Sequence, residues 1–318
     1  MDWFGAGVDG PLIVIRAIHF AATAVVTGSL VFRTVVAEPI LRREHAVAKL
    51  FRRQTLRVAW IGLAIAMASG MFWLLVQAAA MSGHSFGEGM TSDVLLTVLN
   101  ETQFGSISEI RLVLAVVLAV CLAYDRLPLA RWLALAAALG LTAAIAWTGH
   151  AGSTVGETGI LHLTADVLHL IAAAAWIGGL VSLAQLLAGT RHDPAHASFA
   201  RDATRRFSTL GIAAVGTLLL TGIVNAWILV GSTNALFATE YGQLLTLKIC
   251  LFVVMLAFAA VNRFWLTPQL VLAGERLAGE REPLRQLARN SGIEIGLGLA
   301  IYGIVGLLGT LHPAIHFM

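Results

Sequence analysis

Three histidines and one aspartate lie in an otherwise apolar stretch of the sequence. His150 follows one apolar run, and His162, Asp166 and His169 lie within the next one. At about 100° per residue, the last three fall within about 60° of one another on one helix face. Imidazole nitrogens suit copper, zinc, iron or nickel, and a carboxylate one turn away can orient them. The spacing therefore predicts a metal-binding helix face.

Composition places that face inside a membrane. Hydrophobic residues make up 58% of the 318 residues, charged residues only 12%, and the mean hydropathy is +0.82. Apolar runs of about 20 residues, the length that spans a bilayer, recur along the chain. We therefore expect an all-α, polytopic integral membrane protein with a single transmembrane domain over residues 1–318. The eight expected helices cover residues 12–32, 58–81, 107–124, 132–148, 160–187, 207–230, 243–266 and 291–311.

The basic residues predict the orientation. Of 21 Lys and Arg residues, all but Arg16, Arg111 and Lys248 fall in, or at the edge of, four connections between the expected helices. By the positive-inside rule these connections are cytoplasmic and both termini are periplasmic. No basic residue precedes the first apolar run, so we expect the first helix to be retained and not cleaved as a signal peptide. The outer segments then carry His84, in a connection over residues 82–106, and His312.

Several function classes are excluded by what the sequence lacks. Cys121 and Cys250 lie in separate apolar segments with no CxxC motif, which argues against zinc fingers and thioredoxin chemistry. No phosphate-binding glycine loop suggests nucleotide hydrolysis. No nucleophile, base and orienting group combine in a water-accessible connection. The basic residues are not gathered on one folded face. We expect neither an enzyme nor a nucleic-acid-binding protein.

His19 adds an ionisable residue to the first expected helix, about 10 to 12 Å below its outer end at 1.5 Å per residue. A charged residue at the centre of a transmembrane helix costs about 2.5 to 3.5 kcal/mol, so a cluster of ionisable residues indicates function. A structural alternative remains for each residue. A neutral histidine can simply hydrogen-bond between helices, and Asp166 can neutralise Arg16 or Lys248.

Three further stretches accompany the histidine-rich one: Arg206–Gly211 leading to Thr221–Ala226, Tyr241–Lys248, and Asn262–Phe264 with Pro268. In this order, the four blocks resemble the copper resistance D (CopD) family of bacterial inner-membrane proteins over essentially the whole chain. The resemblance implies a multi-helix protein that moves copper from periplasm toward cytoplasm. It also implies a separate periplasmic copper-binding donor of the CopC type, because the chain has no room for that module.

The predicted function is copper import across the inner membrane, in copper homeostasis or resistance. Copper would be captured by outer histidines and passed inward between weak intramembrane sites, because a single tight cage would trap the ion. Histidine with carboxylate suits Cu(II), whereas Met67 and Met71 would favour Cu(I), so the oxidation state stays open. The predicted metal ligands are His19, His84, His150, His162, Asp166, His169 and His312.

Two other classes remain open. A membrane redox protein with b-type haem needs histidines at matched depth on facing helices, and His19 with His169 meets that condition. A copper sensor or assembly factor would bind the metal without moving it. A Soret band in the absorption spectrum would identify the haem protein. The sequence leaves the oligomeric state undetermined.

Overall fold

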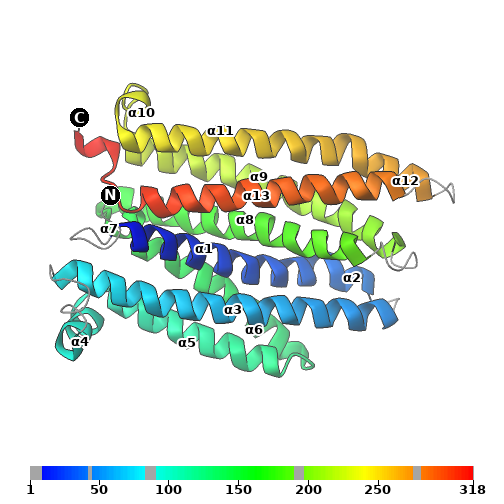
Figure 1. Ribbon diagram of the computed structural model, residues 1–318, viewed down its shortest axis with the longest axis horizontal. Helices are drawn as coiled ribbons and strands as arrows, with labels where there is room; N and C mark the ends of the chain where they lie inside the picture. Colours follow the sequence, from blue (N-terminus) through cyan, green and yellow to red (C-terminus); the bar gives the residue numbers. More distant parts are fainter. Residues whose placement is uncertain (1–8, 42–44, 83–90, 190–196, 275–280, 318) are drawn as a thin grey trace.

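The computed structural model describes residues 9–41, 45–82, 91–189, 197–274 and 281–317. Over these residues the protein is helical with no strand, and eight helices are long and apolar enough to cross a membrane. These helices run side by side along one axis (Figure 1). The prediction of an all-α, polytopic membrane protein is confirmed.

Five of the eight spans are single helices: α3 (His45–Ser82), α5 (Gln103–Ala123), α8 (Gly156–Gly189), α9 (Ala197–Val230) and α13 (Arg281–Leu308). The other three continue into further helical segments: α1 (Asp9–Val31) with η1 (Phe32–Ala37) and α2 (Glu38–Leu41), α6 (Pro128–Ala144) with η3 (Ile145–Thr148), and α11 (Glu240–Val261) with η5 (Asn262–Leu266) and α12 (Thr267–Gly274). Short helices lie outside the spans: α4 (Ser92–Glu101), α7 (His150–Ser153), α10 (Ala235–Ala238) and η6 (Ala314–Phe317).

Several helices extend beyond the apolar runs that predicted them. Helix α3 begins at His45 and not near residue 58, and α9 begins at Ala197 and not near residue 207, so arginine-rich segments predicted as connections are helical. Hydropathy marks the thickness of the hydrocarbon layer, whereas a helix continues wherever water solvates its charged side chains. The outer connection expected over residues 82–106 also contains a helix, α4, which Thr91 caps by accepting a hydrogen bond from the Val94 amide.

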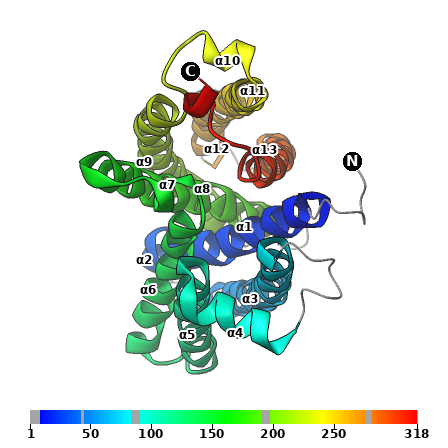
Figure 2. The ribbon, with the colours of Figure 1, turned by 90° about the vertical axis from the view of Figure 1, so that its left-hand side faces the viewer.

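The bundle has two halves that meet at α1 and α8. Figure 2 shows α3, α5 and α6 on one side of this pair, and α9, α11 and α13 on the other. At the crossing, a Cβ atom on Gly28 would overlap the Ala174 carbonyl oxygen and the Gly178 Cα. Glycine at both positions therefore allows the two backbones to touch. This contact fixes the position of α8 against α1.

Helix α1 begins and α13 ends at the same end of the bundle, as eight spans require (Figure 1). At the opposite end, Asp125 follows α5 and forms ion pairs with Arg33 and Arg52. The Nε atom of Arg52 lies 2.6 Å from Asp125 Oδ2. Glu38 Oε1 lies 3.3 Å from Arg33 Nε and 3.6 Å from Arg131 Nη1. These ion pairs join η1 and α2 to α3, to α6 and to the turn between α5 and α6. The periplasmic position of the two termini stays a prediction from the arginine distribution.

Candidate metal-binding site

Helix α8 positions His162, Asp166 and His169 along one face within its N-terminal half. The helix is rich in alanine and leucine, which are strong helix formers, and it runs unbroken over 34 residues. Because each residue rises 1.5 Å, the two histidines are separated by about 10 Å along the axis, with the carboxylate between them. The three side chains therefore form a ladder of positions at successive depths, which we call the α8 ladder.

Both histidines of the ladder are oriented by a threonine. His162 is buried, and its Nδ1 lies 2.8 Å from Thr154 Oγ1. The Nδ1 atom of His169 lies 2.9 Å from Thr221 Oγ1 of α9. A hydrogen-bond partner at one ring nitrogen fixes the ring orientation, as the outer partners of metal-binding histidines do. In both residues the other nitrogen, Nε2, points away from the threonine and is the candidate metal-binding atom.

The carboxylate of Asp166 is held between helices. Asn225 Nδ2 of α9 donates a hydrogen bond of 3.2 Å to Asp166 Oδ1. Lys248 of α11 interacts electrostatically with both Asp166 and His169. Among the described residues, Lys248 and Asp166 form no direct ion pair. A metal cation at this position would meet one negative and one positive side chain.

The histidines predicted to lie on the outer side differ in their relation to the ladder. His150 of α7 interacts electrostatically with His162, and its Nε2 lies 3.3 Å from the Leu308 carbonyl oxygen. Its ring packs edge-on against Tyr241 of α11, with the ring centroids 6.0 Å apart. The structure thus places His150 beside the ladder. His312 is exposed beyond the end of α13, and His84 lies outside the described residues.

His19 lies in a different environment. Its Nδ1 is 3.1 Å from Ser69 Oγ of α3, and Arg111 Nη2 of α5 contacts its Nε2. Both ring nitrogens therefore have protein partners. The indole of Trp73 packs beside the ring, with the centroids 5.6 Å apart. The cluster of His19, Arg16, Arg111 and Trp73 is called the α1 cluster below.

Two buried arginines surround this histidine. The guanidinium carbon atoms of Arg16 and Arg111 each lie 5.2 Å from the centroid of a Trp73 ring. Arg16 Nη1 donates to the Gly309 carbonyl oxygen at the end of α13. No carboxylate in the described part of the chain pairs with either arginine. The α1 cluster is therefore positively charged, which disfavours a metal cation.

The haem alternative depends on His19 and His169 facing a common space. Both residues precede the contact between Gly28 and Gly178 by nine positions, so they lie at similar depth in α1 and α8. However, His19 contacts α3 and α5, whereas His169 contacts α9. The two rings point to different helices.

No preformed metal cage is present in the described residues, because no group of three or more His, Cys, Asp or Glu side chains is close enough to hold one ion. The α8 ladder instead offers separate positions. The methionines considered for Cu(I) lie elsewhere: Met71 is exposed on α3, and Met67 packs against a hydrophobic cluster between α1, α3, α5 and α6.

Comparison with known proteins identifies the family. Residues 200–308 match copper resistance protein D, and residues 8–160 match the copper resistance protein D-like N-terminal domain. The chain is 31% identical to copper resistance protein D of Pseudomonas syringae pv. tomato over 277 residues, which cover 86% of this chain and 87% of that protein. This chain belongs to the copper resistance protein D family.

Two other relatives align with different fractions of this chain. Inner membrane protein YebZ of Escherichia coli (strain K12) is 33% identical over 313 residues, which are 95% of this chain and 98% of YebZ. Copper transport protein CutJ of Bacillus subtilis (strain 168) is 33% identical over 257 residues, which are 78% of this chain and 45% of CutJ. No solved structure matches the chain.

The partners of the ladder, on α9 and in the turn before α8, were not predicted from the sequence. Thr221 and Asn225 are four residues apart and so lie on one face of α9. Since α8 and α9 are consecutive and antiparallel, that face meets His169 and Asp166 at matching depth. The spacing could have revealed this pair. Thr154 lies in a turn, where no helical period predicts its contact.

Proposed function

We propose that this copper resistance protein D family member carries copper across the bacterial inner membrane, from periplasm to cytoplasm, along the face of α8. The protein is a multi-pass inner-membrane protein. The observation that carries the proposal is the α8 ladder, in which His162, Asp166 and His169 lie at successive depths and each has a polar partner. Such residues inside a membrane are costly and typically mark ion pathways.

The proposed route begins at His150, which lies beside His162 near the outer end of α8. Copper then passes His162, Asp166 and His169 in turn. Separate binding positions favour transfer of the copper ion over its storage, because at each step the ion exchanges one weak set of ligands for the next. We place His19 outside the route, because the α1 cluster repels a cation. His84 and His312 remain candidates for capture from the periplasm.

Copper as the cargo is supported by the family. The Pseudomonas relative is named a copper resistance protein, and CutJ a copper transport protein. Imidazole and carboxylate donors suit Cu(II), so we propose that the ladder binds copper in the Cu(II) state. A periplasmic copper-binding protein of the CopC type would act as the donor. We propose a carrier and not an enzyme.

The first experiment measures the metal content and absorption spectrum of the detergent-purified protein after exposure to copper. Wild type and the control His45→Ala, at the opposite end of the bundle, should retain copper. His162→Ala and His169→Ala should lose it, and no preparation should show a Soret band. Copper retained by both ladder variants would contradict the proposed site. A Soret band that disappears in His19→Ala or His169→Ala would instead support haem binding.

The second experiment measures copper uptake into vesicles that contain the purified protein. Uptake by wild type that is absent in His169→Ala is the expected result. Copper bound by wild type without any uptake would contradict transport and support a sensor or assembly factor.

A further inference from the structure

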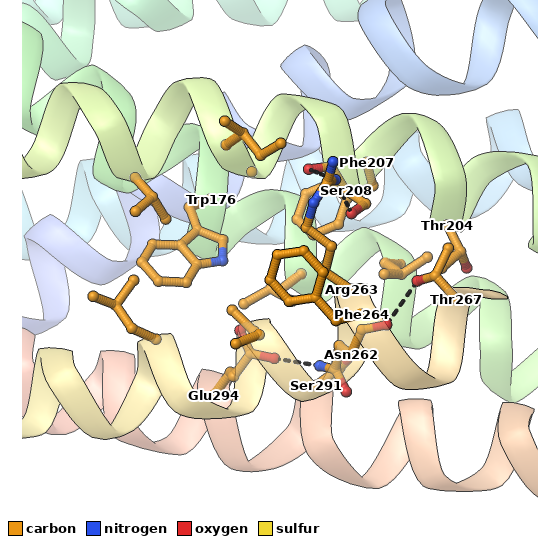
Figure 3. A pocket seen from close by; sticks show the side chains of 18 of the residues that line it. Trp176, Thr204, Phe207, Ser208, Asn262, Arg263, Phe264, Thr267, Ser291 and Glu294 are labelled. Carbon is orange, nitrogen blue, oxygen red and sulfur yellow. Dashed lines mark hydrogen bonds between the residues drawn. The ribbon is translucent and has the colours of Figure 1, made fainter. Parts of the chain in front are cut away.

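A second site lies further inward on the same face of α8. A cavity of about 470 Å³ lies between α8, α9, α11 and α13, with η5 at one side (Figure 3). Trp176 forms part of its α8 wall and lies seven residues after His169, or about 10 Å along the helix. Its volume is within the range of small-molecule pockets in proteins. Neither the ladder nor the α1 cluster uses this cavity.

The mouth of the cavity faces the lipid bilayer. Its lining includes Ile212 and Leu219 of α9 and Phe264 of η5, which are exposed apolar side chains. All three lie inside helices that span the membrane, so lipid and not water covers them. The lining is predominantly apolar, which disfavours a hydrated ion path. A molecule that occupies the cavity would therefore enter from the bilayer.

One end of the cavity is polar and ordered. Asn290 Nδ2 donates to Asn262 Oδ1 at 2.8 Å, and Asn262 Nδ2 donates to Glu294 Oε1 at 2.6 Å. Glu294 is buried, and this chain of amides holds its carboxyl group in place; Figure 3 shows the bond between Asn262 and Glu294. Ser291 is fully buried beside it, and its hydroxyl has no hydrogen-bond partner among the described residues. The polar end thus offers a fixed acceptor and an unused donor.

The backbone at η5 is also specialised. This π-helical turn brings the consecutive residues Asn262, Arg263 and Phe264 to the cavity lining. Arg263 Nη1 donates to Ser208 Oγ at 2.7 Å and to its carbonyl oxygen at 3.2 Å, which ties η5 to α9. Such π-helical turns are frequent at functional sites. Aromatic rings of Trp176, Phe207 and Phe264 contribute flat walls (Figure 3).

We propose that this cavity binds a lipid-soluble quinone or its quinol form. The carboxyl group of Glu294 disfavours a phosphate headgroup, whereas a flat neutral ring with oxygens at its edges matches the polar end. The Ser291 hydroxyl donates to a quinone carbonyl, and a quinol hydroxyl donates to Glu294. The isoprenoid tail leaves through the apolar mouth. The proposal is independent of the copper route.

The test measures binding of decylubiquinone to the detergent-purified full-length protein by quenching of tryptophan fluorescence. Gly216 lines the cavity, and a Cβ atom there meets no atom within 4 Å, so the larger side chain of Gly216→Leu has open space at its base and should occupy part of the cavity. We expect saturable binding by wild type and binding at least about tenfold weaker in Gly216→Leu, which corresponds to about 1.4 kcal/mol. The matched control is Gly303→Leu, equally open but outside the cavity lining, which should bind as wild type.

A second pair of variants tests the polar end. Ser291→Ala should weaken binding about three- to tenfold, since it removes one hydrogen bond. Ser182→Ala, which alters a buried serine bonded to the Gly178 carbonyl outside the cavity, should leave binding unchanged. A thermal unfolding temperature of Gly216→Leu equal to that of wild type would show that its loss of quinone binding is not a loss of fold. Equal decylubiquinone binding by wild type and Gly216→Leu, or a cavity that retains phospholipid and does not take up decylubiquinone, would overturn the proposal.

Discussion

The two intramembrane histidine regions of this protein differ in the charge that surrounds them. In the α8 ladder, two histidines flank Asp166, and Lys248 is the one basic partner found in the described residues. In the α1 cluster, a single histidine contacts Arg111, and Arg16 packs against the same tryptophan. The first region carries both signs of charge, whereas the second is positive.

An imidazole inside a membrane is therefore not by itself a metal site. Coulomb interactions are strong where water is absent, so neighbouring charges decide whether a cation is attracted or repelled. Histidines 19 and 169 look alike in sequence, because each is an ionisable residue in an apolar helix. Their neighbours across the helix interface separate them.

The largest effect is expected from giving the ladder the charge of the α1 cluster. Asp166→Lys should weaken copper binding by more than about 100-fold, because a cation replaces the carboxylate at the centre of the ladder. The milder Asp166→Asn should weaken it about 10- to 100-fold, as the loss of an orienting carboxylate does. Isothermal titration of copper into the purified proteins measures both. Wild-type affinity in Asp166→Lys would mean that copper does not bind along α8.

The opposite change should strengthen binding. Lys248→Met removes the positive charge that interacts with Asp166 and His169, and we expect copper to bind about tenfold more tightly. The only other lysine in the sequence, Lys49, is exposed near the start of α3, so Lys49→Met is the matched control and should have no effect. The same titration checks this prediction. Weaker copper binding in Lys248→Met would show that the lysine supports the site and does not compete with the metal.

A smaller effect is expected from the threonine that orients His169. Thr221→Val keeps the shape of the side chain but removes its hydroxyl, and copper affinity should fall about three- to tenfold. Thr217 lies one turn away on α9, and its hydroxyl donates to the Ala213 carbonyl of the same helix, so Thr217→Val should leave affinity unchanged. Equal affinities in the two variants would show that the ring of His169 needs no such support.

The smallest effect on copper is expected at His19. His19→Ala should leave copper affinity unchanged but lower the free energy of unfolding by about 1 to 3 kcal/mol, because buried Arg111 loses its acceptor. His19→Gln should recover part of that stability, since its amide oxygen can accept from Arg111. Thermal unfolding and copper titration check the two halves of the prediction. A loss of copper as large as in His169→Ala would return His19 to the route.

The eight spans and the α8 ladder could be predicted because both depend on local patterns. A bilayer requires a long apolar run, and helix periodicity puts residues 162, 166 and 169 on one face whatever surrounds them. The helix ends were less accessible, since hydropathy reports where the hydrocarbon ends and not where the helix does. The partners Thr221 and Asn225 lie 52 and 59 residues from the side chains that they bind, and no local pattern spans that distance.

By itself, the sequence determined that the chain spans a membrane eight times and that one helix carries imidazole and carboxylate groups on a single face. Only the tertiary structure decided what lies opposite each of these groups. His19 meets Ser69 and Arg111, which are 50 and 92 residues away, because α1 packs along α3 and the long side chain of Arg111 reaches His19 from α5. Which helices become neighbours depends on close contacts such as that of Gly28 with Gly178, so the charge around each histidine was set by packing.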